Sequence, residues 1–537
     1  MSILIVDFGS QYTHLITKCI NYKLCVPAQL IPFTKIDSYT AVAVDLQGVI
    51  FSGGPRNVNE ISEEQYSILC NFIDSLLKNK IPILGICFGL QLLAKYFGGT
   101  VQQGESGEFG NAKLHLTILQ TLFHNNCSNK DITVWMSHQD KVKSLPEKIF
   151  NVTGYTENCE IAMIESKELN VYGCQFHPEV DNTEHGLDIY RKFIIDICKC
   201  QQVLNNNLIQ NVYNEIVLQL EQGNDQGGKI LIAVSGGVDS TILTHLLNNK
   251  YPNRIICVFI NHGLMRKNEP KEIRKHFEFL SGNDNNSGDK DSGKRFYCVD
   301  AKQEFFEALS GITDPEQKRK VIGKMFIESF QNWATTQSKL FTIEWLAQGT
   351  IYPDVIESCG INKTSQVIKS HHNLSLPDTL NLKVLEPLKF LFKDQVRSIG
   401  EQLKLDHKLI YRHPFPGPGL GIRIVGEVRK DLSRILKKAD KIFIDSLIDN
   451  QLYYSTSQAF ASLFPVKTVG VVGDNRRYGW TIVLRAVTSG DFMTATVSDL
   501  ELEFLTRVAT RIVNECQEVG RVLFDITSKP PGTIEME

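Results

Sequence analysis

Short apolar runs alternate with amphipathic segments along the first 200 residues of the chain. The clearest apolar runs are Ile3–Val6, Gly48–Ser52, Ile81–Ile86 and Val171–Gln175. Runs of this length predict buried strands, and the segments between them predict helices. Strands that alternate with helices are typical of a mostly parallel sheet covered by helices. We therefore expect an α/β domain over residues 1–200.

The same alternation returns after a polar connection over residues 201–228. Apolar residues recur there every four positions, at Leu208, Val212, Ile216 and Leu220. This spacing predicts a helix inside a linker. An apolar strand then begins at Ile230, a helix is expected over Ser240–Leu247, and another strand begins at Arg254. We expect a second α/β domain over residues 229–411.

The segment "RHPFPGPGLGIR", which begins at Arg412, separates this domain from the rest of the chain. Its prolines and glycines exclude a helix or a central strand, so it predicts a rigid connection. We expect a third, small α+β domain over residues 412–537. The polar stretch at residues 281–295, "SGNDNNSGDKDSGKR", predicts a disordered surface loop without chemistry.

The composition narrows the class of protein. The chain has 537 residues, 42% of them hydrophobic and 22% charged, with a net charge of −3. This charge does not favour nucleic acid as a partner, and no apolar run is long enough to predict a membrane span. The N-terminus lacks the pattern of a signal peptide, and the 13 cysteines show no metal-ligand spacing. We expect a cytoplasmic protein.

Cys87 lies between a predicted strand and a predicted helix, in the sequence "GICFG". Glycines on both sides of a nucleophile allow the sharp turn of a nucleophile elbow. The N-terminus of the following helix also favours a thiolate. A buried structural cysteine is the alternative for a single residue of this type.

A cysteine nucleophile needs a base, and His177 in "GCQFHPEV" is the candidate. It follows a strand, and Glu179 is placed to hold its imidazole. Gly53 and Gly54 end an earlier strand in "FSGGPRNV". Their amides, with that of Phe88, are candidates for an oxyanion hole.

A second candidate site is the glycine-rich sequence "AVSGGVDST", which follows the strand at Ile230. Backbone amides at the start of a helix bind phosphates. The sequence is not a Walker P-loop, because no Lys-Ser/Thr pair follows the second glycine.

The ordered motifs SGGP, GICFG and HPE resemble the class I glutamine amidotransferases over residues 1–200. In that family the cysteine attacks the amide of glutamine, which releases ammonia and then glutamate. The resemblance implies that Cys87, His177 and Glu179 are catalytic. It also implies a set of residues that hold glutamine: Gln11, Gln91, Ser137, His138 and Asp140.

The loop "SGGVDS" resembles the PP-loop of ATP pyrophosphatases, which cleave ATP between its α and β phosphates. The implied ATP-binding residues are Ser235, Gly236, Gly237, Val238, Asp239, Ser240, Gly349, Asp354 and Glu357. Asp239 would also hold Mg²⁺ beside the pyrophosphate. A salt-bridging or helix-capping pair is the alternative for Asp354 and Glu357.

The remaining motifs resemble the GMP synthetase (glutamine-hydrolysing) family along the whole chain. They are "GITDPEQKRKVIGKMFIE", "LAQGTIYPDVIES", "KSHHN", "RHPFPGPGL" and "TSKPPGTIEME". The implied substrate is xanthosine 5′-monophosphate (XMP), which ammonia converts to GMP at purine C2 after adenylation. The implied XMP-binding residues are Arg266, Gln458, Lys529, Ile534 and Glu535. The resemblance also implies a lid with Lys369, His371 and His372, and a homodimer formed by the C-terminal domain.

The chain departs from the family pattern at three places. Asn261 and Met536 replace an aspartate and a tryptophan, and the lid sequence "HHNLSLP" lacks a glycine pair. Two other functions are alternatives. One is another PP-loop ligase, which aminates a carboxylate or modifies tRNA, and the other is a nucleotide-sensing protein without turnover. The expected fold is α/β: two doubly wound parallel-sheet domains, a glutamine amidotransferase and an ATP pyrophosphatase, and a small α+β dimerisation domain.

Overall fold

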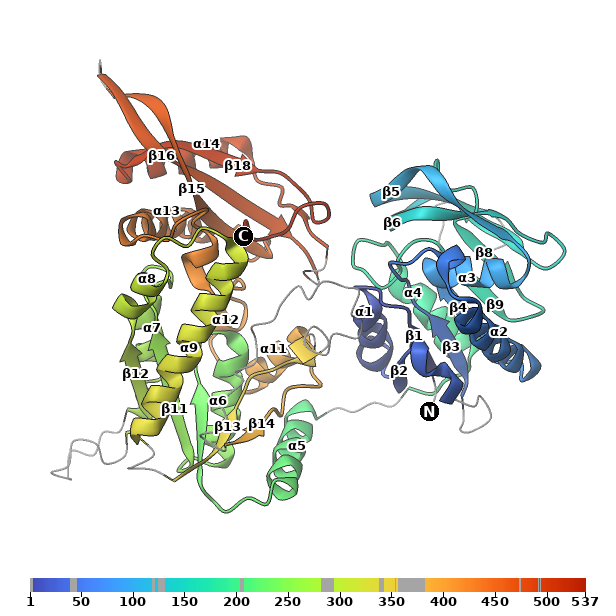
Figure 1. Cartoon of the computed structure of the whole chain (residues 1–537), viewed down its shortest axis with the longest axis horizontal. Helices are drawn as coiled ribbons and strands as arrows, with labels where there is room; N and C mark the ends of the chain where they lie inside the picture. Colours follow the sequence, from blue (N-terminus) through green and yellow to red (C-terminus); the bar gives the residue numbers. More distant parts are fainter. Residues whose placement is uncertain are drawn as a thin grey trace. The chain divides into compact units, whose positions relative to one another are not determined.

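The computed structural model describes most of the chain as two compact units (Figure 1). It leaves undescribed residues 1–2, 39–45, 118–120, 124–130, 203–206, 282–293, 338–341, 353, 356–381, 473–474, 491 and 493. The first unit contains residues 1–206 with the segment Ser489–Thr494, and the second contains most of the chain from Asn207 onward. Glu357, the lid residues Lys369, His371 and His372, and most of the polar stretch at 281–295 lie outside the described residues.

The first unit is built on a nine-stranded sheet in the order β2-β1-β3-β4-β9-β8-β7-β5-β6. Five strands are parallel: β2 (Ala28–Pro32), β1 (Ile3–Asp7), β3 (Gly48–Phe51), β4 (Ile83–Ile86) and β9 (Val171–Cys174). Four more continue the sheet with antiparallel pairing: β8 (Met163–Ser166), β7 (Asn151–Tyr155), β5 (Thr100–Leu116) and β6 (Asp131–Ser144). All four apolar runs of the sequence therefore form neighbouring or near-neighbouring strands.

Helices cover both faces of the parallel part of this sheet. Ile3 and Ile5 of β1 point into one core, whereas Leu4 and Val6 point into the other, as the two-residue period of a strand requires. Helices α1 (Thr13–Lys18) and α4 (Gly186–Arg191) contribute to the first core. Helices α2 (Glu63–Lys78) and α3 (Phe88–Tyr96) contribute to the second.

The second unit contains a five-stranded parallel sheet. Its order is β12 (Phe296–Asp300), β11 (Ile255–Asn261), β10 (Lys229–Ala233), β13 (Ile343–Ala347) and β14 (Lys383–Leu385). One face packs against α5 (Leu208–Gln222), α6 (Val238–Lys250), α7 (Glu269–His276) and α11 (Lys393–Gln402). The other face packs against α8 (Lys302–Ala308) and α9 (Pro315–Gln337). A further short helix is α12 (His407–Ile410).

Helix α5 occupies the predicted linker. Its apolar side chains Val212, Ile216 and Leu220 are buried in the core of the second unit. The four-residue spacing seen in the sequence therefore marks the face of α5 that packs against the sheet, so this part of the linker belongs to the packed unit. The expected domain boundaries themselves stay predictions.

The C-terminal part of the second unit combines a sheet with two helices. Strands β15 (Gln458–Val472) and β16 (Asn475–Thr488) form a long antiparallel ribbon, which β17 (Thr496–Val497) and β18 (Val519–Asp525) extend (Figure 1). Helices α13 (Lys430–Asp449) and α14 (Leu502–Glu515) pack on this sheet. Their core is continuous with one face of the parallel sheet. The predicted fold class is confirmed.

None of the helices in the described part of the chain is long and apolar enough to cross a membrane.

Candidate functional site

Cys87 lies at the turn between β4 and α3, as the sequence predicts. Its φ is +50°, a conformation that residues other than glycine rarely adopt. The two flanking glycines are required by close packing: a Cβ at Gly85 would lie 2.6 Å from the backbone of Gly89, and one at Gly89 would lie 2.3 Å from the carbonyl oxygen of Phe51. The strand and the helix thus approach too closely for any side chain. Cys87 itself is 6% exposed.

His177 follows β9 and lies beside Glu179 in the first unit. The Nδ1 atom of His177 is 2.8 Å from Oε1 of Glu179, and both side chains are buried. Burial lowers the pKa of His177. The charge of Glu179 and hydrogen bonds with Cys87 and Glu179 outweigh this effect and raise it to about 10. The structure thus brings Cys87, His177 and Glu179 together, with a protonated imidazole next to the sulfur at neutral pH.

Further contacts hold this group in place. The hydroxyl of Tyr190 donates to Oε2 of Glu179 at 3.3 Å, and the ring of Tyr12 packs edge-on against His177 at 4.8 Å. The amide of Gln175 donates to Sγ of Cys87 at 3.5 Å. Gln175 is a residue that the sequence analysis missed, although it lies two positions before His177 in the same motif.

Of the candidate oxyanion residues, Gly53 lies next to the imidazole of His177, and Phe88 directly follows Cys87. A Cβ at Gly53 would lie 3.0 Å from Cε1 of His177, and one at Gly54 would lie 2.9 Å from the carbonyl oxygen of Phe8. The Gly53–Gly54 segment therefore packs closely between His177 and Phe8. Phe88 is the first residue of α3, directly after Cys87.

Among the predicted glutamine-binding residues, Ser137 lies near Cys87. Gln91, His138 and Asp140 share one hydrogen-bond network. The carbonyl oxygen of Ser137 lies 4.0 Å from Sγ of Cys87, so this part of β6 reaches the nucleophile. Gln91 is buried, and its amide donates to the carbonyl oxygen of Asp140 at 2.8 Å. The ring of His138 is buried between Glu108 and that same carbonyl. Gln11 lies in an exposed turn.

The second candidate site is the loop between β10 and α6. Gly236 has a φ of +79°, and Gly237 caps α6 at its N-terminus. The Oγ atoms of Ser235 and Ser240 lie 3.2 Å apart, and the amide of Gly237 donates to Oγ of Ser235 at 3.1 Å. These hydrogen bonds stabilise the conformation of the loop. Val238 begins the helix, and backbone amides at a helix N-terminus of this kind can bind phosphate.

Asp239 has two different oxygens. Nζ of Lys393, at the start of α11, lies 2.6 Å from Oδ2. Oδ1 is buried and has no hydrogen-bond partner among the described residues. An unpartnered carboxylate oxygen at a phosphate loop fits a Mg²⁺ ligand. Lys393 lies 154 positions from Asp239 and belongs to no motif, so the sequence alone does not point to it.

Two other predicted ATP-binding residues lie near the same sheet edge. A Cβ at Gly349 would lie 3.1 Å from the amide nitrogen of Ser240, so this glycine allows a close approach to the loop. A carboxylate oxygen of Asp354 accepts from the amide of Ile351 at 3.0 Å. This bond fits the helix-capping alternative for Asp354. Arg412 also reaches the loop and donates to the carbonyl oxygen of Gly236.

Three of the predicted XMP-binding residues, Arg266, Gln458 and Glu535, lie close together at the start of β15. The amide of Gln458 donates to Oε1 of Glu535 at 2.7 Å. Arg266 donates to the carbonyl oxygen of Ala459 at 3.2 Å, next to Gln458. Burial opposes the charge of Arg266, but Asp440 and nearby acidic groups raise its pKa.

The chain's last residues are tied to the fold by several cations. Arg423, which is completely buried, forms two hydrogen bonds of 2.9 and 2.8 Å with the carboxylate of Glu535. Arg485 donates to the carbonyl oxygen of Ile534 at 2.9 Å. The backbone of Lys529 pairs with that of Ala495. Sequence analysis missed Arg423 as the partner of Glu535.

Asn261, which replaces a usual aspartate of the family, ends β11. Its side chain is 3% exposed, and Oδ1 has no partner in the described part of the chain.

Three sequence families match the chain. Glutamine amidotransferase class-I matches residues 4–197, the PP-loop domain matches 206–281, and the GMP synthase C terminal domain matches 445–536. A solved structure from Thermoplasma acidophilum, described as a putative GMP synthase subunit, is 32% identical, with a TM-score of 0.33. That similarity covers 37% of this chain and 94% of the other.

Curated relatives match along the whole sequence. A protein of Legionella pneumophila (strain Lens) named GMP synthase (glutamine-hydrolyzing) is 44% identical over 545 residues, which covers 100% of this chain and 98% of the relative. A protein of Fusobacterium nucleatum with the same name is 42% identical over 538 residues, with 99% of its length covered. These matches confirm the resemblance found in the sequence, and the chain therefore belongs to the enzyme family GMP synthase (glutamine-hydrolyzing).

Proposed function

We propose that this chain makes GMP from XMP, with glutamine as the nitrogen source and ATP as the activating substrate. The observation that supports the proposal most directly is that this member of the family contains two preformed groups of candidate catalytic and binding residues. One joins Cys87, His177 and Glu179, and the other is the loop at Ser235–Ser240.

At the first site Cys87 is the nucleophile. Its sulfur attacks the side-chain amide carbon of glutamine, and His177 gives a proton to the departing ammonia. Glu179 holds His177 by the Nδ1 contact of 2.8 Å. The amides near Gly53, Gly54 and Phe88 stabilise the oxyanion. Water then hydrolyses the thioester to glutamate and restores the thiol.

At the second site the loop binds the β and γ phosphates of ATP. The C2 oxygen of XMP attacks the α phosphorus, which forms adenyl-XMP and releases pyrophosphate. Ammonia then displaces AMP and leaves GMP. Adenylation is needed because a ring oxygen leaves poorly, whereas AMP leaves readily. The α6 N-terminus and Lys393 supply positive charge at the phosphates.

We propose Mg²⁺ as the cofactor, held at Oδ1 of Asp239. This oxygen is buried beside the phosphate loop, and Lys393 contacts only the other oxygen. When bound, Mg²⁺ neutralises phosphate charge and orients the pyrophosphate for departure.

We propose that Arg266, Gln458, Lys529, Ile534 and Glu535 contact XMP. Support comes from Gln458 and Glu535, which are directly hydrogen-bonded, and from Arg266, which lies beside Gln458. We further propose that two copies associate through the C-terminal domain. The β15–β16 ribbon exposes apolar side chains, among them Val469, Val471 and Tyr478, that a second copy would cover. The cytoplasmic location stays a prediction from the sequence.

Replacement of the nucleophile tests the proposal. In Cys87→Ala, GMP formation from glutamine should be lost, because no thioester can form. GMP formation from added ammonium should continue, since the second site is intact. The products should be AMP and pyrophosphate. ADP and orthophosphate would contradict the proposal, as would loss of the ammonium-dependent reaction in folded protein.

A further inference from the structure

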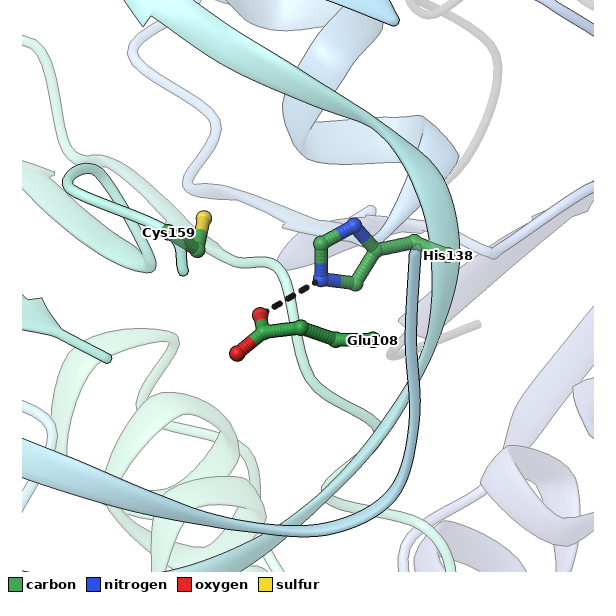
Figure 2. Close-up of side chains that lie close together, drawn as sticks. All are labelled: Glu108, His138 and Cys159. Carbon is green, nitrogen blue, oxygen red and sulfur yellow. Dashed lines mark hydrogen bonds and ion pairs between the residues drawn. The ribbon is translucent and has the colours of Figure 1, made fainter. Parts of the chain in front are cut away.

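Glu108 and His138 face one another on the neighbouring strands β5 and β6. They are directly paired in the register of the two strands. Nε2 of His138 lies 3.1 Å from Oε2 of Glu108, and each residue is 7% exposed (Figure 2). Glu108 belongs to none of the quoted motifs and has no part in the proposed reaction, yet a buried carboxylate is costly unless its charge is paired or hydrogen-bonded.

The contacts of the two side chains determine their protonation. Nδ1 of His138 lies 3.0 Å from the carbonyl oxygen of Asp140, and a carbonyl only accepts, so Nδ1 carries a proton. The hydroxyl of Thr156 donates to Oε1 of Glu108 at 2.8 Å. Burial raises the pKa of Glu108, but the hydrogen bonds from His138 and Thr156 outweigh it and lower the pKa overall. An ionised carboxylate only accepts, so Nε2 of His138 donates to Oε2 of Glu108.

A continuous path of hydrogen bonds joins this pair to the nucleophile. The carbonyl oxygen of Asp140, which accepts from His138, also accepts from the amide of Gln91 at 2.8 Å. That amide lies 3.3 Å from Oε1 of Gln175, whose own amide donates to Sγ of Cys87 at 3.5 Å. Movement of the Asp140 carbonyl would therefore disturb the groups around the sulfur.

We propose that Glu108 and His138 form a buried carboxylate–imidazolium pair that positions the segment Ser137–Asp140 against the glutamine site. The proposal rests on the proposed hydrolysis of glutamine at Cys87. Both are positioning residues, because they act through the backbone of β6. The carbonyl oxygen of Ser137 lies 4.0 Å from Sγ of Cys87, so the positioned segment reaches the reacting atoms.

Three other titratable side chains lie near Glu108 and His138, and none of them takes the place of either residue in the pair. Lys141 and Asp140 flank it on β6, and Cys159 lies on the adjoining turn. Burial and then the charge of Glu108 raise the pKa of Cys159 to about 12, so this thiol is neutral.

The cluster of Glu108, His138 and Cys159 also has the composition of a metal site (Figure 2). Their potential ligand atoms lie within 4.8 Å of one another. A metal would need the Nε2 lone pair of His138, whereas the contacts place a proton there. Both oxygens of Glu108 and both nitrogens of His138 already have partners. The pair is complete without an ion.

Kinetics of Glu108 variants test the positioning role. In Glu108→Ala the KM for glutamine should rise by about 10- to 100-fold, because the β6 segment loses its support. GMP formation from ammonium should stay within about twofold of wild type. In Glu108→Gln the side-chain amide can donate to Nε2 of a neutral His138, so the KM should return most of the way to the wild-type value.

The pair His115 and Asp131 provides a matched control. It lies on the same two strands, with Nδ1 2.8 Å from Oδ1, but it is partly exposed. Asp131→Asn should leave the glutamine KM unchanged. An unchanged KM in folded Glu108→Ala would overturn the proposal. Loss of the ammonium-dependent reaction together with the glutamine reaction would also overturn it, because the effect would then not be confined to the glutamine site.

The protonation state has its own readout. Nitrogen NMR of the whole protein, with the His138 signals assigned by their loss in His138→Gln, should show both ring nitrogens protonated at neutral pH. The Glu108→Gln variant should show one. A single protonated nitrogen in the wild type would overturn the assigned charge, and so would stoichiometric zinc that is lost in Cys159→Ser. If wild type and Cys87→Ala used glutamine equally, the proposed function would fail, whereas the NMR result would still decide the pair.

Discussion

His177 has a charge that the surrounding side chains impose. Its pKa of about 10 lies above the ordinary value of 6.5 because Glu179 and Cys87 favour the protonated ring more than burial disfavours it. A histidine whose pKa is higher in the folded state than in the unfolded state stabilises the fold. This stabilisation is complete below about pH 6.5 and is lost as the pH rises through about 10.

The Glu179→Gln variant should remove the main source of this shift. At pH 7 its melting temperature should lie below that of wild type, because the buried imidazolium loses its counter-charge. The difference should shrink as the pH approaches 10, where the wild type loses the same stabilisation. Melting curves between pH 6 and 11 measure it. A difference that stays constant over this range would contradict the assignment.

Lys393 contacts the glycine-rich loop, with Nζ 2.6 Å from Oδ2 of Asp239. Lys393→Met should lower GMP formation from both glutamine and ammonium by about 10- to 100-fold, because the variant lacks a cation at the phosphates. The KM for ATP should rise, and Lys389→Met is the control. Lys389 lies four residues earlier and contacts the ring of Phe390. Equal ATP kinetics in the two variants would exclude the role of Lys393.

At the scale of elements, the close contact of β4 and α3 fixes the position of Cys87. The residue after β3 also takes part, because the amide of Gly89 donates to the carbonyl oxygen of Ser52 at 3.1 Å. The turn therefore holds Cys87 at a positive φ through packing on both sides. Such strain persists only where the surrounding structure enforces it.

Gly89→Ala tests this packing. The new Cβ would lie 2.3 Å from the carbonyl oxygen of Phe51, so α3 must move away from the sheet. We expect a loss of at least about 2 kcal/mol in the free energy of unfolding. Gly470→Ala is the control, since its nearest atom would lie at 3.7 Å. Denaturant unfolding followed by circular dichroism compares them, and equal stability would show that the turn has room to relax.

At the scale of the whole molecule, the β15–β16 ribbon leaves apolar surface uncovered. Val469 and Val471 are 49% and 76% exposed, and Tyr478, opposite Val469, is 64% exposed. Side chains two positions apart on a strand lie on one face, so these three form one patch. An exposed patch of this kind is typical of a protein interface.

Val471→Arg should weaken association of two copies, because a charge would be buried in the interface. Sedimentation velocity of the wild type should give the mass of a dimer, and the variant should shift toward the mass of one chain. The melting temperature controls for folding, since Val471 contributes little to the core. A wild type that stays monomeric would contradict the dimer.

The sequence by itself determined the parts of this protein that depend on neighbouring residues. Apolar runs specified the strands, the glycines of "GICFG" and "SGGVDS" specified the turns, and the His-x-Glu spacing specified the contact of His177 with Glu179. Each follows from local sterics or from the period of a helix or strand. These features were enough to predict the fold class and the turns that carry Cys87 and the loop at Ser235–Ser240.

Only the tertiary structure decided which distant side chains complete those sites. Lys393 reaches Asp239 across 154 positions, Gln175 reaches Cys87 across 88, and Glu108 reaches His138 across 30. The last pairing also depends on a shift in register between β5 and β6 after Gln103. No local sequence pattern encodes such contacts. They form only when the packing of helices and strands places residues that are far apart in the sequence next to one another.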